Sequence, residues 1–321
     1  MEKKKVILDV DTGTDDAIAI MTAVMSENLE VLGVCAVNGN RGIDFTTENT
    51  LRVVEYLGKD IPVFRGCSLP MVVSLTEGRR EDIPYKGPKD PQDNVHGDYI
   101  DLPPATIQEQ PVSAVRWLVD TLMASEGDIT LIPVGPLTNI AMALRIEPRI
   151  AQKIKRIVIM GGGCREVNIT PTAEFNFWID PEAAKIVFDC GCDILVVPLD
   201  ATHAAAVSIR TAEALERKGT KPATLTARII RQRQNAYKHW QPMADIDSVP
   251  VHDALAVCAV LDESILEPVV ETYADVDIGK GAADGMSIFD LDNRYKDRKK
   301  NVKVALGADP ERFADMLLNI L

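Results

Sequence analysis

The stretch VILDVDTGTDDA, residues 6–17, passes from an apolar run into a cluster of acidic residues. The run Val6–Val10 lacks the polar alternation of a strand with one solvated face, so it predicts a strand that is buried on both faces. Gly13 permits a tight turn, and Asp15 and Asp16 then fall in the first turn of a following helix. A buried strand, a glycine turn and a helix are typical of one unit of a parallel α/β sheet.

The same alternation of short apolar runs and amphipathic segments continues along the chain. The expected strands are Val6–Val10, Val31–Val37, Ile129–Val134, Ile157–Met160 and Ile194–Leu199, and the expected helices are Asp15–Met25, Phe45–Leu57, Val112–Ala124, Thr138–Leu144 and Pro181–Asp189. We therefore predict an α/β fold, with an open, mainly parallel, doubly wound (Rossmann-like) sheet and helices on both faces.

The second half of the chain adds helices and a closing segment. Thr138 and Asp180 are expected N-caps, because short polar side chains favour that position. From about Ser208 to Pro268 the pattern is mostly helical, and Val269–Leu321 predicts a few strands and a last helix over Pro310–Ile320. With no repeat or evident linker, residues 1–321 are expected to form a single domain.

Composition excludes some classes of partner. The 321 residues carry a formal net charge of −13, which argues against nucleic acid and anionic membranes as default partners. No apolar stretch approaches the roughly 20 residues of a membrane span. Six scattered cysteines predict free, largely buried thiols in a reducing compartment, and the charged N-terminal residues do not form a signal peptide. We expect a cytoplasmic protein.

Residues 76–104 differ from the rest of the sequence, because they are rich in proline, glycine and charge and have no periodicity. A long irregular segment in a compact domain is usually functional or mobile. This segment is expected to be either a mobile flap over a pocket or a plain surface excursion.

The aspartates after the first expected strand suggest a metal site. Asp11, Asp15 and Asp16 lie within six residues, and three converging carboxylates repel one another unless a cation or a proton is present. A hard divalent ion with oxygen ligands relieves that repulsion. The alternative is that Asp15 and Asp16 are only dipole-compatible residues at a helix start, but this leaves Asp11 and Gly13 unexplained.

Polar residues also follow the other expected strands, at the edge where open parallel sheets bind ligands. The amides of Asn38-Gly39-Asn40 could bond a hydroxyl or simply form a turn, and the irregular bend of Pro133–Asn139 could free a carbonyl for a metal. After Met160–Gly163 come Asn168 and Glu174-Phe175-Asn176, which could grip hydroxyls or be ordinary loop residues.

His252-Asp253 opens an apolar helix. On its own this pair reads best as a helix cap. Near a metal, however, Asp253 can be a ligand and His252 a proton donor, because the titration range of histidine suits acid catalysis.

Taken together, these motifs resemble the inosine–uridine-preferring nucleoside hydrolase family. Residues 9–17 look like its DxDxGxDDA signature, and the resemblance continues in family order through Asn40, Gly135–Asn139, Met160–Gly163, Glu174–Asn176, Asp180–Ala184 and His252-Asp253, with looser similarity to the end. Thr12 departs from the proline common in the signature, and Val134 from the threonine of some members. The resemblance implies the nucleoside hydrolase fold and hydrolysis of the N-glycosidic bond of ribonucleosides to free base and ribose.

The resemblance also implies roles for individual residues. Asp11, Asp16, the carbonyl of Val134 and Asp253 would hold Ca²⁺, and Asp11 would be the base that deprotonates a calcium-bound water. Asp15, Asn40, Asn168, Glu174 and Asn176 would bind ribose hydroxyls, Met160 and Phe175 would line the sugar, and His252 would protonate the leaving base. His96 resembles the histidine of the family's flap, while Tyr237, His239 and Trp240 could meet the nucleobase. A homodimer or homotetramer is implied, and the preferred base is left open.

Two other functions remain as alternatives. Asp9–Thr14 also resembles the DxDxT motif of haloacid-dehalogenase-type phosphatases, with Asp9 as the nucleophile and Mg²⁺ as the ion. That interpretation gives no role to Asp15, Asp16 or His252-Asp253, and offers only Asp284 and Asp290 as later metal aspartates. The second alternative is a non-catalytic ribose- or nucleoside-binding protein on the same scaffold.

Overall fold

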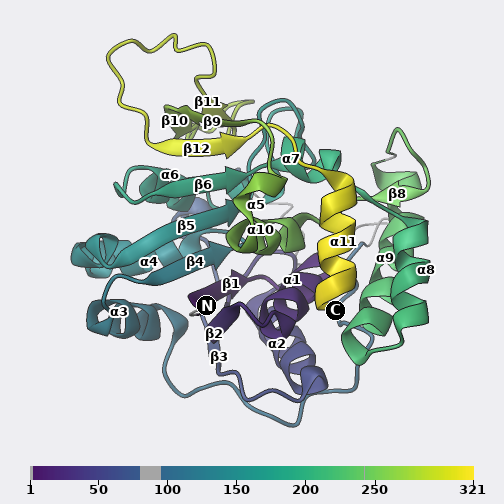
Figure 1. Cartoon of the computed structure of the whole chain (residues 1–321). Helices are drawn as coiled ribbons and strands as arrows, with labels where there is room; N and C mark the ends of the chain where they lie inside the picture. Colours follow the sequence, from purple (N-terminus) through teal and green to yellow (C-terminus); the bar gives the residue numbers. More distant parts are fainter. Residues whose placement is uncertain (1–2, 80–94, 242) are drawn as a thin grey trace.

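A computed structural model describes residues 3–79, 95–241 and 243–321, except for the side chains of Ser74, His239 and Trp240. Within these residues an eight-stranded sheet has the order β3-β2-β1-β4-β5-β6-β12-β9 (Figure 1). Its strands are β1 (Lys4–Val10), β2 (Leu29–Ala36), β3 (Val63–Arg65), β4 (Ile129–Pro133), β5 (Ile154–Met160), β6 (Ile194–Val197), β9 (Val269–Thr272) and β12 (Val302–Ala305). All neighbouring pairs are parallel except β12 and β9, which are antiparallel. The predicted fold class is confirmed.

The helices divide between the two faces of the sheet. One face packs against α1 (Thr14–Met25), α2 (Ile43–Leu57), α9 (Lys221–Trp240), α10 (His252–Leu261) and α11 (Pro310–Ile320), and the other against α3 (Ala114–Ala124), α4 (Thr138–Ile146) and α6 (Pro181–Phe188). Val6, Leu8 and Val10 of β1 belong to the first core and Ile7 to the second. Both faces of β1 are therefore buried, which explains why its sequence shows no polar alternation.

The remaining elements are short or peripheral. They are η1 (Val73–Leu75), η4 (Pro148–Gln152), α5 (Phe175–Ile179), α7 (Leu199–Ala204), β7 (Val207–Ser208), α8 (Ile209–Lys218), β8 (Ser248–Val249), η5 (Glu263–Ile265), β10 (Ala274–Val276) and β11 (Ser287–Phe289). The last helix covers the predicted residues Pro310–Ile320, and residues 208–268 are mostly helical as predicted.

One of the two predicted helix caps is wrong. Asp180 does cap α6, because its Oδ1 accepts a hydrogen bond from the Ala183 amide at 3.2 Å. Thr138 is instead the first residue of α4, whose N-cap is Leu137. The Thr138 hydroxyl donates to Asp180 Oδ2 at 2.7 Å, so it links the start of α4 to the N-cap of α6 instead of capping α4.

Other expectations concern the irregular segment, the cysteines and the membrane. Residues 80–94 of the expected flap lie outside the described residues, and its described parts, 76–79 and 95–104, contain no helix or strand. All six cysteines are free as predicted, but only Cys35 and Cys258 are fully buried. In the described chain, no helix is long and apolar enough to cross a bilayer.

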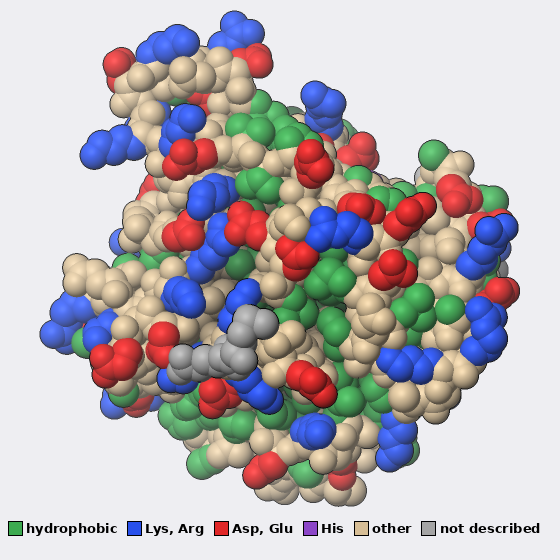
Figure 2. Space-filling model, in the orientation of Figure 1, with side chains coloured by type: hydrophobic (Ala, Val, Ile, Leu, Met, Phe, Trp, Pro, Cys, Tyr) green, Lys and Arg blue, Asp and Glu red, His purple; other side chains and the backbone are tan. Residues whose placement is uncertain are grey.

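Charged side chains of both signs are interspersed over the face seen in Figure 2. Lys and Arg gather on the excursion between β11 and β12, at the upper left of Figures 1 and 2. The formal charge of −13 is therefore not concentrated in one acidic patch on this face.

Candidate active site

The polar residues that follow the parallel strands surround one cavity of about 300 Å³. Its lining residues are Asp11, Asp15, Asn40, Arg41, Val95, His96, Val134, Met160, Asn168, Ile169, Glu174, Phe175, Asn176, Arg233, Tyr237, His252 and Asp253. This set contains all the site residues expected from the sequence except Asp16, which is fully buried, and His239 and Trp240, whose side chains lie outside the described residues. The strand ends therefore converge as the position of ligand sites in parallel sheets predicts.

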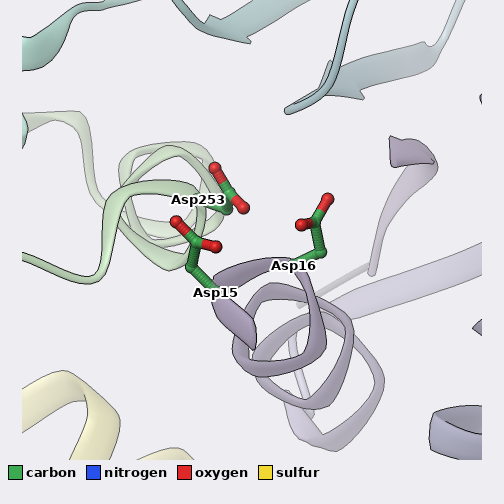
Figure 3. Close-up of side chains that lie close together, drawn as sticks. All are labelled: Asp15, Asp16 and Asp253. Carbon is green, nitrogen blue, oxygen red and sulfur yellow. The ribbon is translucent and has the colours of Figure 1, made fainter. Parts of the chain in front are cut away.

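Three aspartates from two helix N-termini meet at the cavity, where Asp15 and Asp253 line it and Asp16 lies next to them. Figure 3 shows Asp15 and Asp16 at the start of α1 and Asp253 at the start of α10. One carboxylate oxygen from each lies within 4.8 Å of the others, and all three residues are buried. Residues far apart in the sequence thus supply one cluster of hard oxygen donors.

Asp16 also has a structural role at the start of its own helix. Its Oδ1 accepts from the Asp11 amide at 3.1 Å and its Oδ2 from the Gly13 amide at 2.9 Å. Burial, followed by the charge of Asp15, raises the pKa of Asp16 to about 7. The helix-cap interpretation is therefore correct for Asp16, but it does not account for the other carboxylates.

Asp11 is held where two glycine backbones leave room for it. A Cβ atom on Gly39 would lie 2.1 Å from Asp11 Oδ2, and one on Gly135 would lie 2.7 Å from Asp11 Oδ1. The backbone amide of Asn40 donates to Asp11 Oδ2 at 2.7 Å. Burial, and then the charge of Asp16, raise the pKa of Asp11 well above its usual range. Larger side chains at positions 39 and 135 would therefore displace this carboxylate.

The carboxylate cluster fits a divalent cation. Burial raises the pKa of Asp253 well above its usual range, and the charges of Asp15 and Asp16 raise it further. Within the described part of the chain, Asp15 Oδ1 is buried and makes no hydrogen bond, although it lies 3.0 Å from Arg233 Nη1. Buried carboxylates that repel one another are stabilised by a cation with oxygen ligands. The described residues can therefore hold a metal ion.

The donor set differs in one respect from the set implied by the sequence. Asp15 joins Asp16 and Asp253 in the close group, whereas Asp11 lies beside that group in the same cavity wall. The Val134 carbonyl also lines the cavity and accepts from Asn176 Nδ2 at 2.8 Å. Asp15 is thus a member of the close group, and Asp11 and Val134 line the same cavity.

Another wall of the cavity consists of amides and a carboxylate. Glu174 accepts from the backbone amides of Gly162 at 2.8 Å, Asn176 at 2.9 Å and Phe177 at 3.2 Å. Burial raises the pKa of Glu174 to about 7 in spite of these hydrogen bonds. Asn168 Oδ1 accepts from the Phe175 amide at 2.9 Å. These bonds fix the wall, which presents polar groups suited to hydroxyls.

His252 lies between two hydroxyl groups. Its Nδ1 is 2.7 Å from Thr202 Oγ1, and its Nε2 is 2.8 Å from the Tyr237 hydroxyl. Burial, and then the charge of Arg233, lower the pKa of His252 well below 6.5. In the absence of a substrate the ring is therefore neutral at pH 7.

His96 comes from the described end of the irregular segment. The Thr14 amide donates to His96 Nδ1 at 3.1 Å, and Asp15 Oδ1 lies 3.6 Å from the same nitrogen. Burial lowers the pKa of His96 to about 4. The expected flap histidine is thus neutral and in contact with the start of α1.

Two arginines of the cavity were not expected from the sequence. Arg233, only 1% exposed, donates to Thr14 Oγ1 at 2.9 Å and to the Pro250 carbonyl at 3.1 Å. Arg41 donates to Asp98 Oδ1 at 3.0 Å. The available signal was spacing, because Arg233 precedes Tyr237 by four residues and thus shares its helix face.

Asp9, the nucleophile of the phosphatase alternative, does not line the cavity. It accepts from Asn139 Nδ2 at 2.8 Å and is 1% exposed. Asp284, one of the later aspartates of that alternative, pairs with Arg79. The arrangement therefore gives no support to a phosphatase centre.

Comparisons with known proteins agree with this geometry. Residues 6–315 match the model of the inosine-uridine preferring nucleoside hydrolase family. The pyrimidine-specific ribonucleoside hydrolase RihB of Escherichia coli O157:H7 is 36% identical over 318 residues, 98% of this chain and 95% of the relative. Among solved structures, a purine-preferring ribonucleoside hydrolase from Gardnerella vaginalis aligns with a TM-score of 0.85 and 28% identity, covering 98% and 97% of the two chains. A plant nucleoside hydrolase gives a TM-score of 0.85 and 30% identity, with 98% of each chain covered.

Proposed function

Because the chain belongs to the inosine-uridine preferring nucleoside hydrolase family, it is a hydrolase that acts on N-glycosidic bonds, and we propose that it splits ribonucleosides into ribose and free base at the cavity described above. The observation that carries this proposal is the pairing of a buried carboxylate cluster with an amide and carboxylate wall in one cavity. The relatives named above are pyrimidine-specific and purine-preferring, so the proposed substrate class is ribonucleosides as a whole.

The cation proposed for the cluster is Ca²⁺. Hard oxygen donors in a flexible, irregular arrangement suit Ca²⁺ better than Mg²⁺, which requires near-octahedral geometry. Asp11, Asp16, Asp253 and the Val134 carbonyl would hold it, with Asp15 close enough to contribute. When bound, the ion would supply Lewis acidity to the attacking water and would compensate the charge of the carboxylates.

Asp11 is the proposed general base. Its carboxylate lines the cavity beside the proposed ion, where it can take a proton from an attacking water. Gly39, Gly135 and the Asn40 amide fix its position, so the carboxylate is oriented before the substrate arrives.

The polar side chains of the cavity are proposed to bind the sugar. Asp15, Asn40, Asn168, Glu174 and Asn176 would accept or donate hydrogen bonds to ribose hydroxyls, with Met160 and Phe175 against the ring. Positive charge develops on the sugar as the glycosidic bond breaks, and ionised Asp15 and Glu174 would stabilise it.

The base is proposed to leave on the side of His252 and Tyr237. These residues line the cavity and contact each other through Nε2 and the phenol hydroxyl. His252 is the proposed proton donor to the departing base. It would act after taking up a proton in the substrate complex, since the free ring is neutral.

The test combines substrates, chelation and two products. The purified protein is incubated with uridine, cytidine, inosine, adenosine and their 5′-nucleotides, with and without a chelator, and free ribose and inorganic phosphate are measured. Ribose release that the chelator abolishes and Ca²⁺ restores is the expected result. Ribose release that the chelator leaves unchanged would overturn the metal assignment alone, and phosphate release would support the phosphatase. Nucleoside binding without turnover would support a binding protein.

We also propose that residues 1–321 form one domain and that the protein assembles as a homodimer or homotetramer, as the family resemblance implies. Light scattering coupled to size-exclusion chromatography measures the assembly directly, and a monomer would contradict it.

A further inference from the structure

Thr202 contacts the proposed catalytic histidine from outside the cavity. It lies in α7, is 1% exposed, and its hydroxyl oxygen is 2.7 Å from His252 Nδ1. The same hydroxyl donates its hydrogen to the Leu199 carbonyl at 3.2 Å. A threonine hydroxyl has a single hydrogen, so while that hydrogen lies on the Leu199 carbonyl the oxygen acts toward His252 as an acceptor.

The direction of the neighbouring hydrogen bonds follows from this. Because Thr202 accepts, Nδ1 of His252 carries the hydrogen, and in the neutral ring Nε2 then presents a lone pair. The Tyr237 hydroxyl lies 2.8 Å from Nε2 and therefore donates to it.

Arg233 contacts the other end of this chain of bonds. Its Nη2 lies 3.4 Å from the Tyr237 oxygen, a long contact in which the guanidinium can only donate. The Tyr237 oxygen accepts from Arg233, which leaves its hydrogen available for His252 Nε2. This contact is compatible with a hydrogen on Nδ1, and the Leu199 carbonyl is the group that favours that orientation.

We propose that Thr202 is a positioning residue that holds His252 with its hydrogen on Nδ1, so that Nε2 on the cavity side is the nitrogen that gains and loses the catalytic proton. This inference rests on the proposed function, because it assigns a proton-transfer atom for the proposed reaction. Before that step Nε2 takes up a proton from solvent in the substrate complex. The C1′–N bond then breaks with its electron pair passing to the base nitrogen, which takes that proton from Nε2. Water adds its oxygen to C1′, and its released proton goes to Asp11, which returns it to solvent.

The first test measures the tautomer. Protein labelled with ¹⁵N-histidine contains four histidines, and the His252→Asn spectrum identifies the signals of residue 252. The expected wild-type spectrum at neutral pH shows Nδ1 protonated and Nε2 unprotonated. Thr202→Val removes the acceptor and should shift population to the other tautomer, whereas Thr202→Ser should restore the wild-type pattern. A wild-type ring protonated on Nε2 alone would overturn the proposal.

The second test separates positioning from general damage to the fold. Thr202→Val should lower kcat for uridine and inosine by about 10- to 100-fold, part of the effect of a general acid, with little change in KM. Hydrolysis of p-nitrophenyl β-D-ribofuranoside should change less than twofold, because its phenolate leaves without a proton. Equal losses on both substrate types, or no loss on nucleosides, would overturn the proposal.

A matched control removes another buried threonine hydroxyl. Thr226 of α9 is 0% exposed and its hydroxyl has no hydrogen-bond partner among the described residues, so Thr226→Val should leave kcat on both substrate types unchanged. The failure of the proposed function would look different. Wild-type protein would then release no ribose from any nucleoside, while the ¹⁵N spectrum would still report the tautomer.

Discussion

Replacing Arg233 with methionine should destabilise the protein far more than replacing its neighbour Arg231. Arg233 is 1% exposed and lies 3.0 Å from Asp15, which is itself 7% exposed in its side chain. Removing one partner of a buried ion pair leaves the other charge uncompensated, at a cost of about 3–5 kcal/mol in the free energy of unfolding. Methionine keeps much of the side-chain volume, so the loss reflects charge and hydrogen bonding rather than a cavity.

Arg231 is the matched control on the same helix. It pairs with Glu216 at 2.7 Å, but the two side chains are 41% and 47% exposed. Exposed ion pairs contribute roughly 0–1 kcal/mol, so Arg231→Met should change stability by no more than that. Both variants would be compared with the wild type by urea denaturation followed by circular dichroism, in the presence of a chelator so that no bound cation obscures the difference.

The reasoning would be refuted if both variants lost the same stability, or if Arg233→Met lost less than about 1 kcal/mol. Either result would mean that Asp15 is compensated without the guanidinium. A loss above about 5 kcal/mol would exceed the value for the pair and would indicate that the bonds to Thr14 and Pro250 contribute separately.

Four further outcomes are expected. Asp11→Asn should lower kcat by about 10²–10⁴-fold with an unchanged circular dichroism spectrum, whereas Asp9→Asn should keep most of the turnover, and equal losses would contradict the assignment of the base. Gly39→Ala should lower kcat by about 100-fold, because its Cβ would displace Asp11, and a fully active variant would show that the carboxylate position is not critical. Since the pKa of Glu174 is raised to about 7, its carboxylate forms as the pH rises through 7, so kcat/KM should increase from pH 6 to 8. That increase should be missing in Glu174→Gln, and its persistence would assign it to another group. Ca²⁺ at 100 times its Kd should stabilise the wild type by about 2.7 kcal/mol and so raise its thermal midpoint. The midpoint of Asp253→Asn should not rise, and equal shifts in the two proteins would place the ion elsewhere.

The sheet was predictable because its strands are buried on both faces. Val6–Val10 alternates between the two cores, so every position is apolar until Asp9. Strand β3 was not predicted, since Val63–Arg65 is too short to show any periodicity. Thr138 was misassigned because its hydroxyl is used by Asp180, a partner 42 residues away in the sequence.

The candidate site was predictable to the extent that strand ends meet at one edge. Arg233 was missed because a basic residue in a long polar helix is normally solvated, and only the packing of α9 shows that it faces the cavity. The close grouping of Asp15, rather than Asp11, with Asp253 was also beyond the sequence. The direction of the Asp11 side chain depends on the Asn40 amide and on the space at Gly39, which are contacts between loops rather than local patterns.

The meeting of α1 and α10 in Figure 3 has a consequence for folding. Asp16 and Asp253 are 237 positions apart in the sequence, so the cluster exists only after these two distant segments have been brought together. Such a contact closes a very long loop, whose entropy must be lost before any ion gains its ligands. A cation would therefore bind late in folding and would stabilise the native structure rather than direct the early steps of folding. Its affinity would then report whether both halves of the chain have reached their native places.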